Sequence, residues 1–146
     1  MRHLIAPLAA ACALAVAPLG SWTACAAPAP PPLTVQVEDS PDLGRVLADL
    51  QGHTLYRYDL DTTSAIACTG ECTRTRPPFP YHPGEVLALP PGIAGTLGEV
   101  RRPDGSEQIT YDGAPLYTCT GDHFPGDTNG NGGHWHAIQP PNAPGH

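Results

Sequence analysis

Short stretches in which apolar and polar residues alternate run through the chain from residue 34 to residue 138, separated by Gly, Pro, Asn and Asp. Such alternation predicts strands with one buried face, and no stretch here has the length and spacing of a substantial helix. One helical turn is expected within 65–73, and a loop over 81–95. We expect an all-β or β-rich fold with about seven short strands, at residues 34–37, 45–50, 54–58, 96–102, 106–111, 116–119 and 134–138.

A ten-residue segment occurs twice. Gly52-His-Thr-Leu-Tyr56-Arg-Tyr58-Asp-Leu-Asp61 returns in altered form as Gly113-Ala-Pro-Leu-Tyr117-Thr-Cys119-Thr-Gly-Asp122, with Gly, Leu, Tyr and Asp at the same offsets. An internal repeat predicts one supersecondary unit used twice. We expect two pseudo-symmetric β-hairpin repeats, at about residues 45–80 and 106–138, packed into one small domain with long Gly/Pro loops.

The N-terminus has the pattern of an export signal. A basic start, Met1-Arg-His, precedes an alanine-rich apolar run from Leu4 to Leu19, which prolines interrupt and which is too short for a membrane span. We predict a signal peptide at 1–25, a proline-rich tether at 26–32, the two-repeat domain at 33–139 and a tail at 140–146. Two cleavage modes stay open: a small-x-small site at Ala24-Cys25-Ala26, or a lipobox that ends at Cys25 and makes it the lipid anchor.

The acidic net charge of the chain limits the classes of partner that it is expected to bind. The chain has no lysine, and without Arg2 it carries six arginines against fourteen acids. This balance excludes nucleic acid and charge-driven adhesion to anionic lipid, and it leaves an N-terminal lipid as the only expected membrane contact.

The repeated tyrosines and acids are candidates for a binding cleft. Tyr56 and Tyr58 leave the same face of a strand, Asp61 follows the end of that strand, and Tyr117 with Asp122 repeats the arrangement. The alternative is structural, because buried phenols need acceptors and the aspartates supply them.

Cys68-x-x-x-Cys72 predicts a disulfide in an oxidising compartment. The same spacing occurs in copper sites, but the histidine expected four residues after the second cysteine is Arg76. Cys119 is then the odd cysteine, either free or linked to one of the two.

Two further patterns suggest metals. Asp127-x-Asn129-x-Asn131-Gly132 resembles the start of a calcium loop, without its closing glutamate, and is equally typical of turns. His134-x-His136 places two imidazoles on one strand face for zinc or copper, or at the surface around Trp135.

Taken in order, these motifs resemble a bacterial secreted or lipoprotein repeat family of unknown function that is described by a Tyr-x-aromatic-x-x-Asp motif. Two positions depart from the family pattern: Arg76 replaces a tryptophan before the double proline, and Cys119 replaces the second aromatic of repeat two. The matching segments are Tyr56-x-Tyr58-x-x-Asp61, Cys68-Thr-Gly-Glu-Cys72, Asp104-Gly105-Ser106, Gly113-x-Pro-Leu-Tyr117, Gly121-Asp122 and Trp135-His136.

The resemblance implies an exported cell-envelope protein, lipid-anchored or secreted, and brings no established activity. No catalytic motif occurs in the sequence, so we expect a binding or structural module without enzymatic activity or cofactor, whose partner is an envelope protein or a small ligand. The alternative is an envelope metal-binding protein for copper, zinc or calcium, or a redox protein.

Overall fold

The computed structural model describes residues 20, 29 and 32–142. The chain divides into two units, residues 1–30 and 31–146, and the fold below belongs to the second unit. The predicted signal peptide, Cys25 and the end of the predicted tail lie outside the described residues. Within the described part, no helix has the length and apolarity to cross a membrane.

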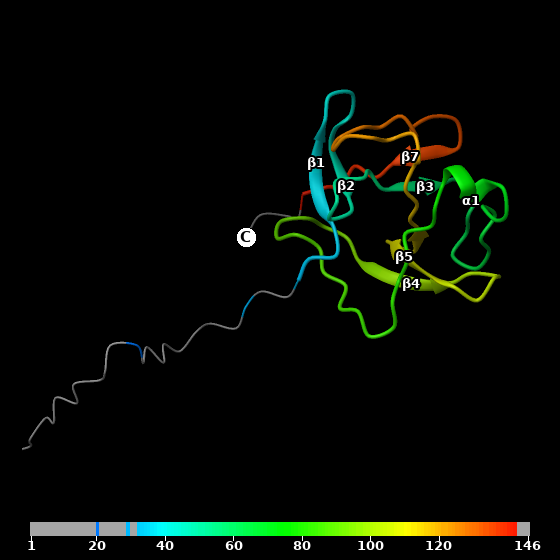
Figure 1. Cartoon of the computed structure of the whole chain (residues 1–146), viewed down its shortest axis with the longest axis horizontal. Helices are drawn as coiled ribbons and strands as arrows, with labels where there is room; N and C mark the ends of the chain where they lie inside the picture. Colours follow the sequence, from blue (N-terminus) through cyan, green and yellow to red (C-terminus); the bar gives the residue numbers. More distant parts are fainter. Residues whose placement is uncertain (1–19, 21–28, 30–31, 143–146) are drawn as a thin grey trace, which may run out of the picture. The chain divides into compact units, whose positions relative to one another are not determined.

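The domain is all-β, with seven short strands and a single helical turn among the described residues. In Figure 1 the β1–β2 hairpin lies at the upper left of the domain, β3 and β7 lie to its right, and the β4–β5 hairpin lies below them. The elements are β1 (Gln36–Ser40), β2 (Gly44–Ala48), β3 (Tyr56–Tyr58), α1 (Cys72–Thr75), β4 (Leu97–Arg101), β5 (Glu107–Tyr111), β6 (Ala114–Pro115) and β7 (Trp135–Ala137).

The strands form three small antiparallel sheets, with orders β1-β2, β3-β7 and β4-β5-β6. The β5–β6 turn uses Asp112 and Gly113, both with positive φ (49° and 82°), which is the backbone of a tight two-residue hairpin turn. β3 pairs with β7 and not with β2. The β3–β7 sheet therefore joins two segments that lie far apart in the sequence.

The hairpin of the first repeat, over residues 45–58, is held to the segment at residue 138 by a closed ring of three backbone hydrogen bonds. Leu55 N donates to Leu47 O (2.8 Å), Leu47 N to Ile138 O (2.8 Å) and Ile138 N to Leu55 O (2.9 Å). The three bonds form a closed cycle among residues 47, 55 and 138. The closing residue of this first ring, Ile138, therefore comes from the second repeat.

The second hairpin carries the same ring. Leu116 N donates to Ile109 O (3.0 Å), Ile109 N to Phe79 O (2.9 Å) and Phe79 N to Leu116 O (2.8 Å). Here the closing residue comes from the first repeat. The two repeats are thus related by a pseudo-twofold and exchange their closing segments.

The core follows from this exchange. Leu47, Leu55, Ile109, Leu116 and Ile138, the aliphatic ring residues, form one buried apolar cluster to which both repeats contribute. Burying it requires both repeats at once, because each hairpin alone leaves its ring open. The prediction of two pseudo-symmetric repeats in one small domain is confirmed.

Several predicted boundaries were wrong. The first strand lies at 36–40 and not 34–37, because its register is fixed by pairing with β2 across the turn at 41–43. The second predicted strand pairs mainly with β1, and its pairing with 54–58 reduces to the bridge between Ala48 and Thr54 and the ring bond of Leu55. The helical turn begins at Cys72, later than expected.

Candidate functional site

The motif tyrosines bond the aspartate of the other repeat. Tyr56 Oη donates to Asp122 Oδ2 (2.5 Å), and Tyr117 Oη donates to Asp61 Oδ2 (2.6 Å). We call Tyr56–Asp122 the first joint and Tyr117–Asp61 the second joint. Both phenols are fully buried. The offsets in the sequence predict that tyrosine and aspartate are paired. They do not determine whether each tyrosine bonds the aspartate of its own repeat or of the other repeat.

The two tyrosines also meet through their backbones. Tyr56 N donates to Tyr117 O (2.8 Å) and Tyr117 N to Tyr56 O (2.9 Å), which is a reciprocal pair at the pseudo-twofold. The repeated residue therefore marks the position where the two halves of the domain join.

The second carboxylate oxygen of each motif acid holds the loop that follows it. Asp61 Oδ1 accepts from Ala67 N (2.7 Å) and from Cys68 N (3.3 Å). Asp122 Oδ1 accepts from Asn129 N (2.9 Å). Each aspartate thus links one long loop to the tyrosine of the opposite repeat.

Burial, together with the hydrogen bond to a carboxylate, makes both phenols hard to ionise. Burial is the main cause that raises the pKa of Tyr117 to about 12, and the bond to Asp61 adds to it. Burial and then the bond to Asp122 raise the pKa of Tyr56 further still. Both phenols therefore stay neutral donors at physiological pH.

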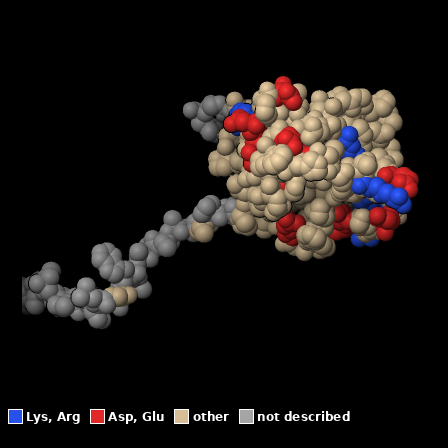
Figure 2. Space-filling model, turned by 45° about the horizontal axis from the view of Figure 1, so that its top comes forward, with Lys and Arg blue, Asp and Glu red and all other residues tan. Residues whose placement is uncertain are grey.

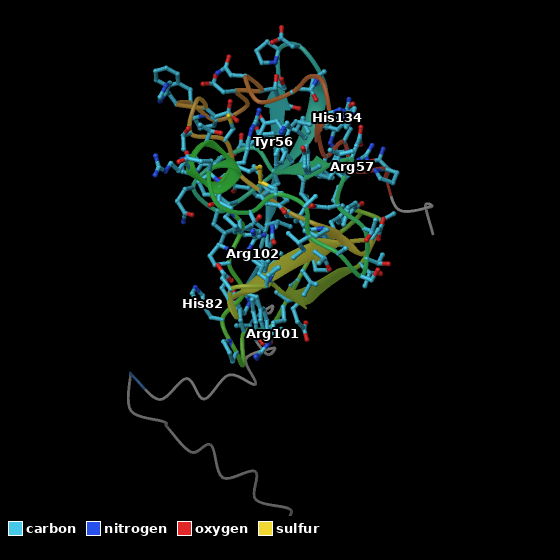
Figure 3. All side chains as sticks on the ribbon, turned by 90° about the vertical axis from the view of Figure 1, so that its right-hand side faces the viewer. Tyr56, Arg57, His82, Arg101, Arg102 and His134 are labelled. Carbon is cyan, nitrogen blue, oxygen red and sulfur yellow. A yellow bond between two sulfur atoms is a disulfide. The ribbon has the colours of Figure 1, made fainter. Side chains whose placement is uncertain are left out.

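Buried Arg102 supports the second joint. Nη2 donates to Cys68 O (2.6 Å), and Nη1 donates to Gln108 Oε1 (2.5 Å) and to Tyr117 Oη (3.4 Å). Figure 3 places it inside the domain, whereas Arg101 lies at the domain end near His82. A lone arginine has no spacing signal, so sequence reasoning missed this residue.

Trp135 lies at the centre of an aromatic cluster. Tyr58 stacks on its ring (centroids 4.4 Å apart, planes at 20°), and Tyr117 meets it edge-on at 5.1 Å. The guanidinium of Arg76 lies over the same ring at 4.6 Å and over the Tyr56 ring at 5.4 Å. The motif aromatics therefore pack across the joint between the repeats.

A polar groove of about 540 Å³ lies between the repeats, on the other face of the β3–β7 pair. Strand alternation directs Arg57 and His136 away from the face that carries Tyr56 and Trp135. The groove is lined by Arg57 from β3, by Tyr111, Asp112 and Ala114 from the second hairpin, and by Asn131 and residues 136–139.

Three side chains form a hydrogen-bonded cluster at this groove. Asp59 accepts from Arg57 Nη1 at Oδ1 (2.9 Å), and its Oδ2 lies 2.6 Å from His136 Nε2. The bond with His136, followed by the charges around it, holds the pKa of Asp59 below its usual range. The other four N–H groups of the Arg57 guanidinium remain available as hydrogen-bond donors to another acceptor.

The predicted disulfide is present, between Cys68 and Cys72, while Cys119 is a partly exposed free thiol. A loop this short gives an entropic stabilisation of about 2 kcal/mol. Its carbonyl at Cys68 is an acceptor for Arg102, so the cross-link fixes the loop that contacts the second joint.

The predicted calcium residues bond the backbone around them. Asp127 Oδ2 accepts from His123 N and Phe124 N, which lowers the pKa of Asp127. Asn129 Nδ2 donates to Gly121 O, and Asn131 Oδ1 accepts from Ala137 N.

The predicted histidine pair lies on β7 and just before it. His134 meets Tyr58 edge-on, and His136 contacts Asp59. Among residues 32–142, no three His, Cys, Asp or Glu side chains gather as a metal-binding group would.

Comparison with protein families gives one match. The model of a family described as a secreted repeat of unknown function matches twice, at residues 39–79 and 98–139. The two matches cover more than half of the chain and coincide with the two structural repeats. Searches among curated proteins and among solved structures find no match.

Proposed function

The chain belongs to the family of secreted repeats of unknown function, and from that premise we propose that it is a non-catalytic binding module outside the cytoplasm, with its ligand in the groove between the repeats. The crossed joints support this proposal most strongly. Tyr56, Tyr117, Asp61 and Asp122 use their polar atoms on one another and on loop backbone, so the motif builds the scaffold. Binding then falls to residues that the scaffold leaves available.

Two residues of the charged cluster beside the groove, Arg57 and Asp59, have no counterpart of the same type in the second repeat. By the pseudo-twofold, Arg57 and Asp59 of the first repeat correspond to Thr118 and Thr120 of the second. A pair of matching backbone bonds fixes this correspondence, Asp59 N to His134 O (2.9 Å) and Thr120 N to Thr75 O (3.1 Å). The charged cluster therefore occurs in one half only, which is typical of a site added to a symmetric scaffold.

The available groups favour an acceptor-rich ligand. Arg57 and Asn131 line the groove, and the remaining N–H groups of Arg57 and the Nδ2 of Asn131 are hydrogen-bond donors there. A guanidinium binds carboxylates through paired hydrogen bonds. We propose a small organic anion as the ligand class.

The charge distribution on the face shown in Figure 2 favours binding of an anion at one specific site over non-specific attraction to the whole surface. Most of that face is uncharged, and most of the arginine atoms visible on it adjoin acidic residues. An anion would then be held by the cluster at Arg57 and not by a general positive potential.

Titration with succinate, followed by backbone NMR shifts, tests the proposal. We expect shifts at Arg57, Asn131 and His136, none with the uncharged analogue succinamide, and about tenfold weaker binding in Arg57→Gln, since one charge-assisted bond contributes about 1.5–3 kcal/mol. The matched control is Arg74→Gln, which removes an exposed arginine outside the groove. Equal binding of both compounds, or no loss in Arg57→Gln, would contradict the proposal.

We also propose that Cys25 carries a lipid that anchors the exported chain. The proposal rests on the lipobox-like end of the signal sequence at Thr23-Ala24-Cys25. Mass spectrometry of the N-terminal peptide tests it: a diacylglyceryl mass on Cys25 is expected, and an unmodified Cys25 or a start at Ala27 would contradict it.

A further inference from the structure

The pseudo-twofold relates two cross-strand pairs that differ sharply in chemistry. Tyr58 lies opposite Trp135 in the β3–β7 pair. The bridge between Pro78 and Tyr117 repeats the pairing of Tyr56 with Ala137, which makes Cys119 and Arg76 the equivalents of Tyr58 and Trp135. The second half of the molecule therefore holds a thiol and a guanidinium where the first half holds an aromatic stack.

Arg76 and Cys119 border the same small space. A Cβ built on Gly130 would clash with Arg76 Nη1 and lie 2.9 Å from Cys119 Cβ, with the Tyr56 ring at 2.8 Å. Only a glycine fits beneath this pair. Thus the thiol and the guanidinium are neighbours and not merely residues of equivalent strands.

The guanidinium has an unused donor. Arg76 Nη1 is the one buried side-chain nitrogen or oxygen in the described part of the chain that has no hydrogen-bond partner. Stacking over Trp135 and Tyr56 occupies the flat faces of the guanidinium and leaves Nη1 unpaired. A buried donor without an acceptor costs free energy, which argues for a partner that arrives from outside.

We propose that Cys119 is a covalent modification site for small anionic disulfides, with Arg76 as the positioning residue that attracts the anion. The Cys119 sulfur attacks one sulfur of the incoming disulfide R–S–S–R. A Cys119–S–S–R bond forms, the S–S bond of the incoming disulfide breaks, and the other half leaves as the thiolate R–S⁻, which takes up the proton that Cys119 has lost. The disulfide is the oxidant, so no other co-reactant is needed.

The surroundings suit this reaction. Cys119 is partly exposed and is the free cysteine of the described residues, since Cys68 and Cys72 are paired with each other. The family is secreted, and small disulfides persist in oxidising compartments. The site lies on the aromatic face of the β3–β7 pair and does not depend on the proposed anion groove.

Two disulfides whose released thiols are followed by absorbance make the test, one thiol in the visible range and the other in the ultraviolet. DTNB carries two carboxylates, whereas 4,4′-dithiodipyridine is neutral, so the ratio of their rate constants reports attraction of the anion. We expect labelling at Cys119, located by peptide mapping and absent in Cys119→Ser, and a DTNB to dithiodipyridine ratio that falls about threefold to tenfold in Arg76→Gln.

Two controls separate charge from packing. Arg74→Gln removes a nearby exposed arginine and should leave the ratio unchanged. Arg76→Lys keeps the positive charge and should keep most of the ratio, while Arg76→Gln loses it in a chain that still melts cooperatively. An unreactive Cys119 in the folded protein, an unchanged ratio in Arg76→Gln, or equal losses in the Lys and Gln variants would overturn the proposal.

Discussion

The first and second joints use the same pair of side chains in different surroundings. At the first joint Asp122 is buried, and the loop it holds is a glycine- and asparagine-rich segment whose Gly130 N also donates to Tyr56 Oη (3.2 Å). At the second joint Asp61 is partly exposed, and its loop is closed by the Cys68–Cys72 disulfide and contacted by buried Arg102. The repeat therefore preserves the contact across the joint, while each loop is stabilised by its own means.

Removing the acid should separate the two joints most clearly. Asp122→Ala removes the acceptor of the buried Tyr56 Oη and that of Asn129 N, and each lost acceptor costs about 1–3 kcal/mol. We expect a loss of about 3 kcal/mol in the free energy of unfolding measured by urea denaturation. Asp61→Ala should cost less, because Asp61 is partly exposed and water can enter the space that its carboxylate leaves.

Asp122→Asn serves as the control for that comparison. The amide keeps one oxygen acceptor and nearly the same volume, so it should recover about half of the lost stability. An equal loss in Asp61→Ala and Asp122→Ala would contradict the asymmetry between the joints.

Alkaline pH should weaken both joints. The folded pKa of Tyr117, about 12, lies above its ordinary value of 10.0, so the contribution of this phenol is complete below pH 10 and is lost as pH rises toward 12. Over this window the free energy of unfolding should fall by about 1.4 kcal/mol per pH unit for each such phenol. Urea denaturation between pH 9 and pH 11.5 measures the slope.

Phenylalanine variants identify the groups behind that slope. Tyr117→Phe should lower the slope between pH 10 and pH 12, because it removes a phenol whose pKa burial raises. A steep slope that persists in Tyr117→Phe and in Tyr56→Phe would show that other groups govern alkaline unfolding.

The smallest expected effect comes from making the halves alike. Arg76→Trp with Cys119→Tyr rebuilds, in the second half, the stack that Tyr58 and Trp135 form in the first. The double variant loses the unpaired donor and gains an aromatic pair worth about 0.5–1.5 kcal/mol, so its free energy of unfolding should rise by about 1 kcal/mol. Calorimetric melting checks it, with each single variant expected below the double; a double variant less stable than the parent would contradict the equivalence of the two pairs.

The repeat in the sequence predicted the main features of the fold because Gly52, Tyr56 and Asp61 recur with Gly113, Tyr117 and Asp122 at fixed offsets. Turn chemistry at Asp104-Gly105 and Asp112-Gly113 predicted the chain reversals of the β4–β5–β6 sheet, whereas its third strand lies at 114–115 and not at the predicted 116–119. Local patterns of this kind report which residues lie on one strand and where the chain reverses.

Pairing between distant segments could not be predicted in this way. Identical offsets are compatible with a bond from Tyr56 to Asp61 or to Asp122, and only the exchange of the closing segments at Phe79 and Ile138 selects the second. Arg57 and Arg76, the donors of the candidate sites, have no arginine at the equivalent position of the other repeat. Their roles follow from the elements packed against them, which a single sequence does not specify.

Double-mutant cycles on Tyr56 test the crossed joints most directly. Tyr56→Phe is combined with Asp122→Ala in one cycle and with Asp61→Ala in the other, and the free energies of unfolding give a coupling energy for each pair. The crossed joints predict a coupling of about 1–2 kcal/mol between Tyr56 and Asp122 and nearly none between Tyr56 and Asp61. A larger coupling within the first repeat, between Tyr56 and Asp61, would contradict the exchange between the repeats.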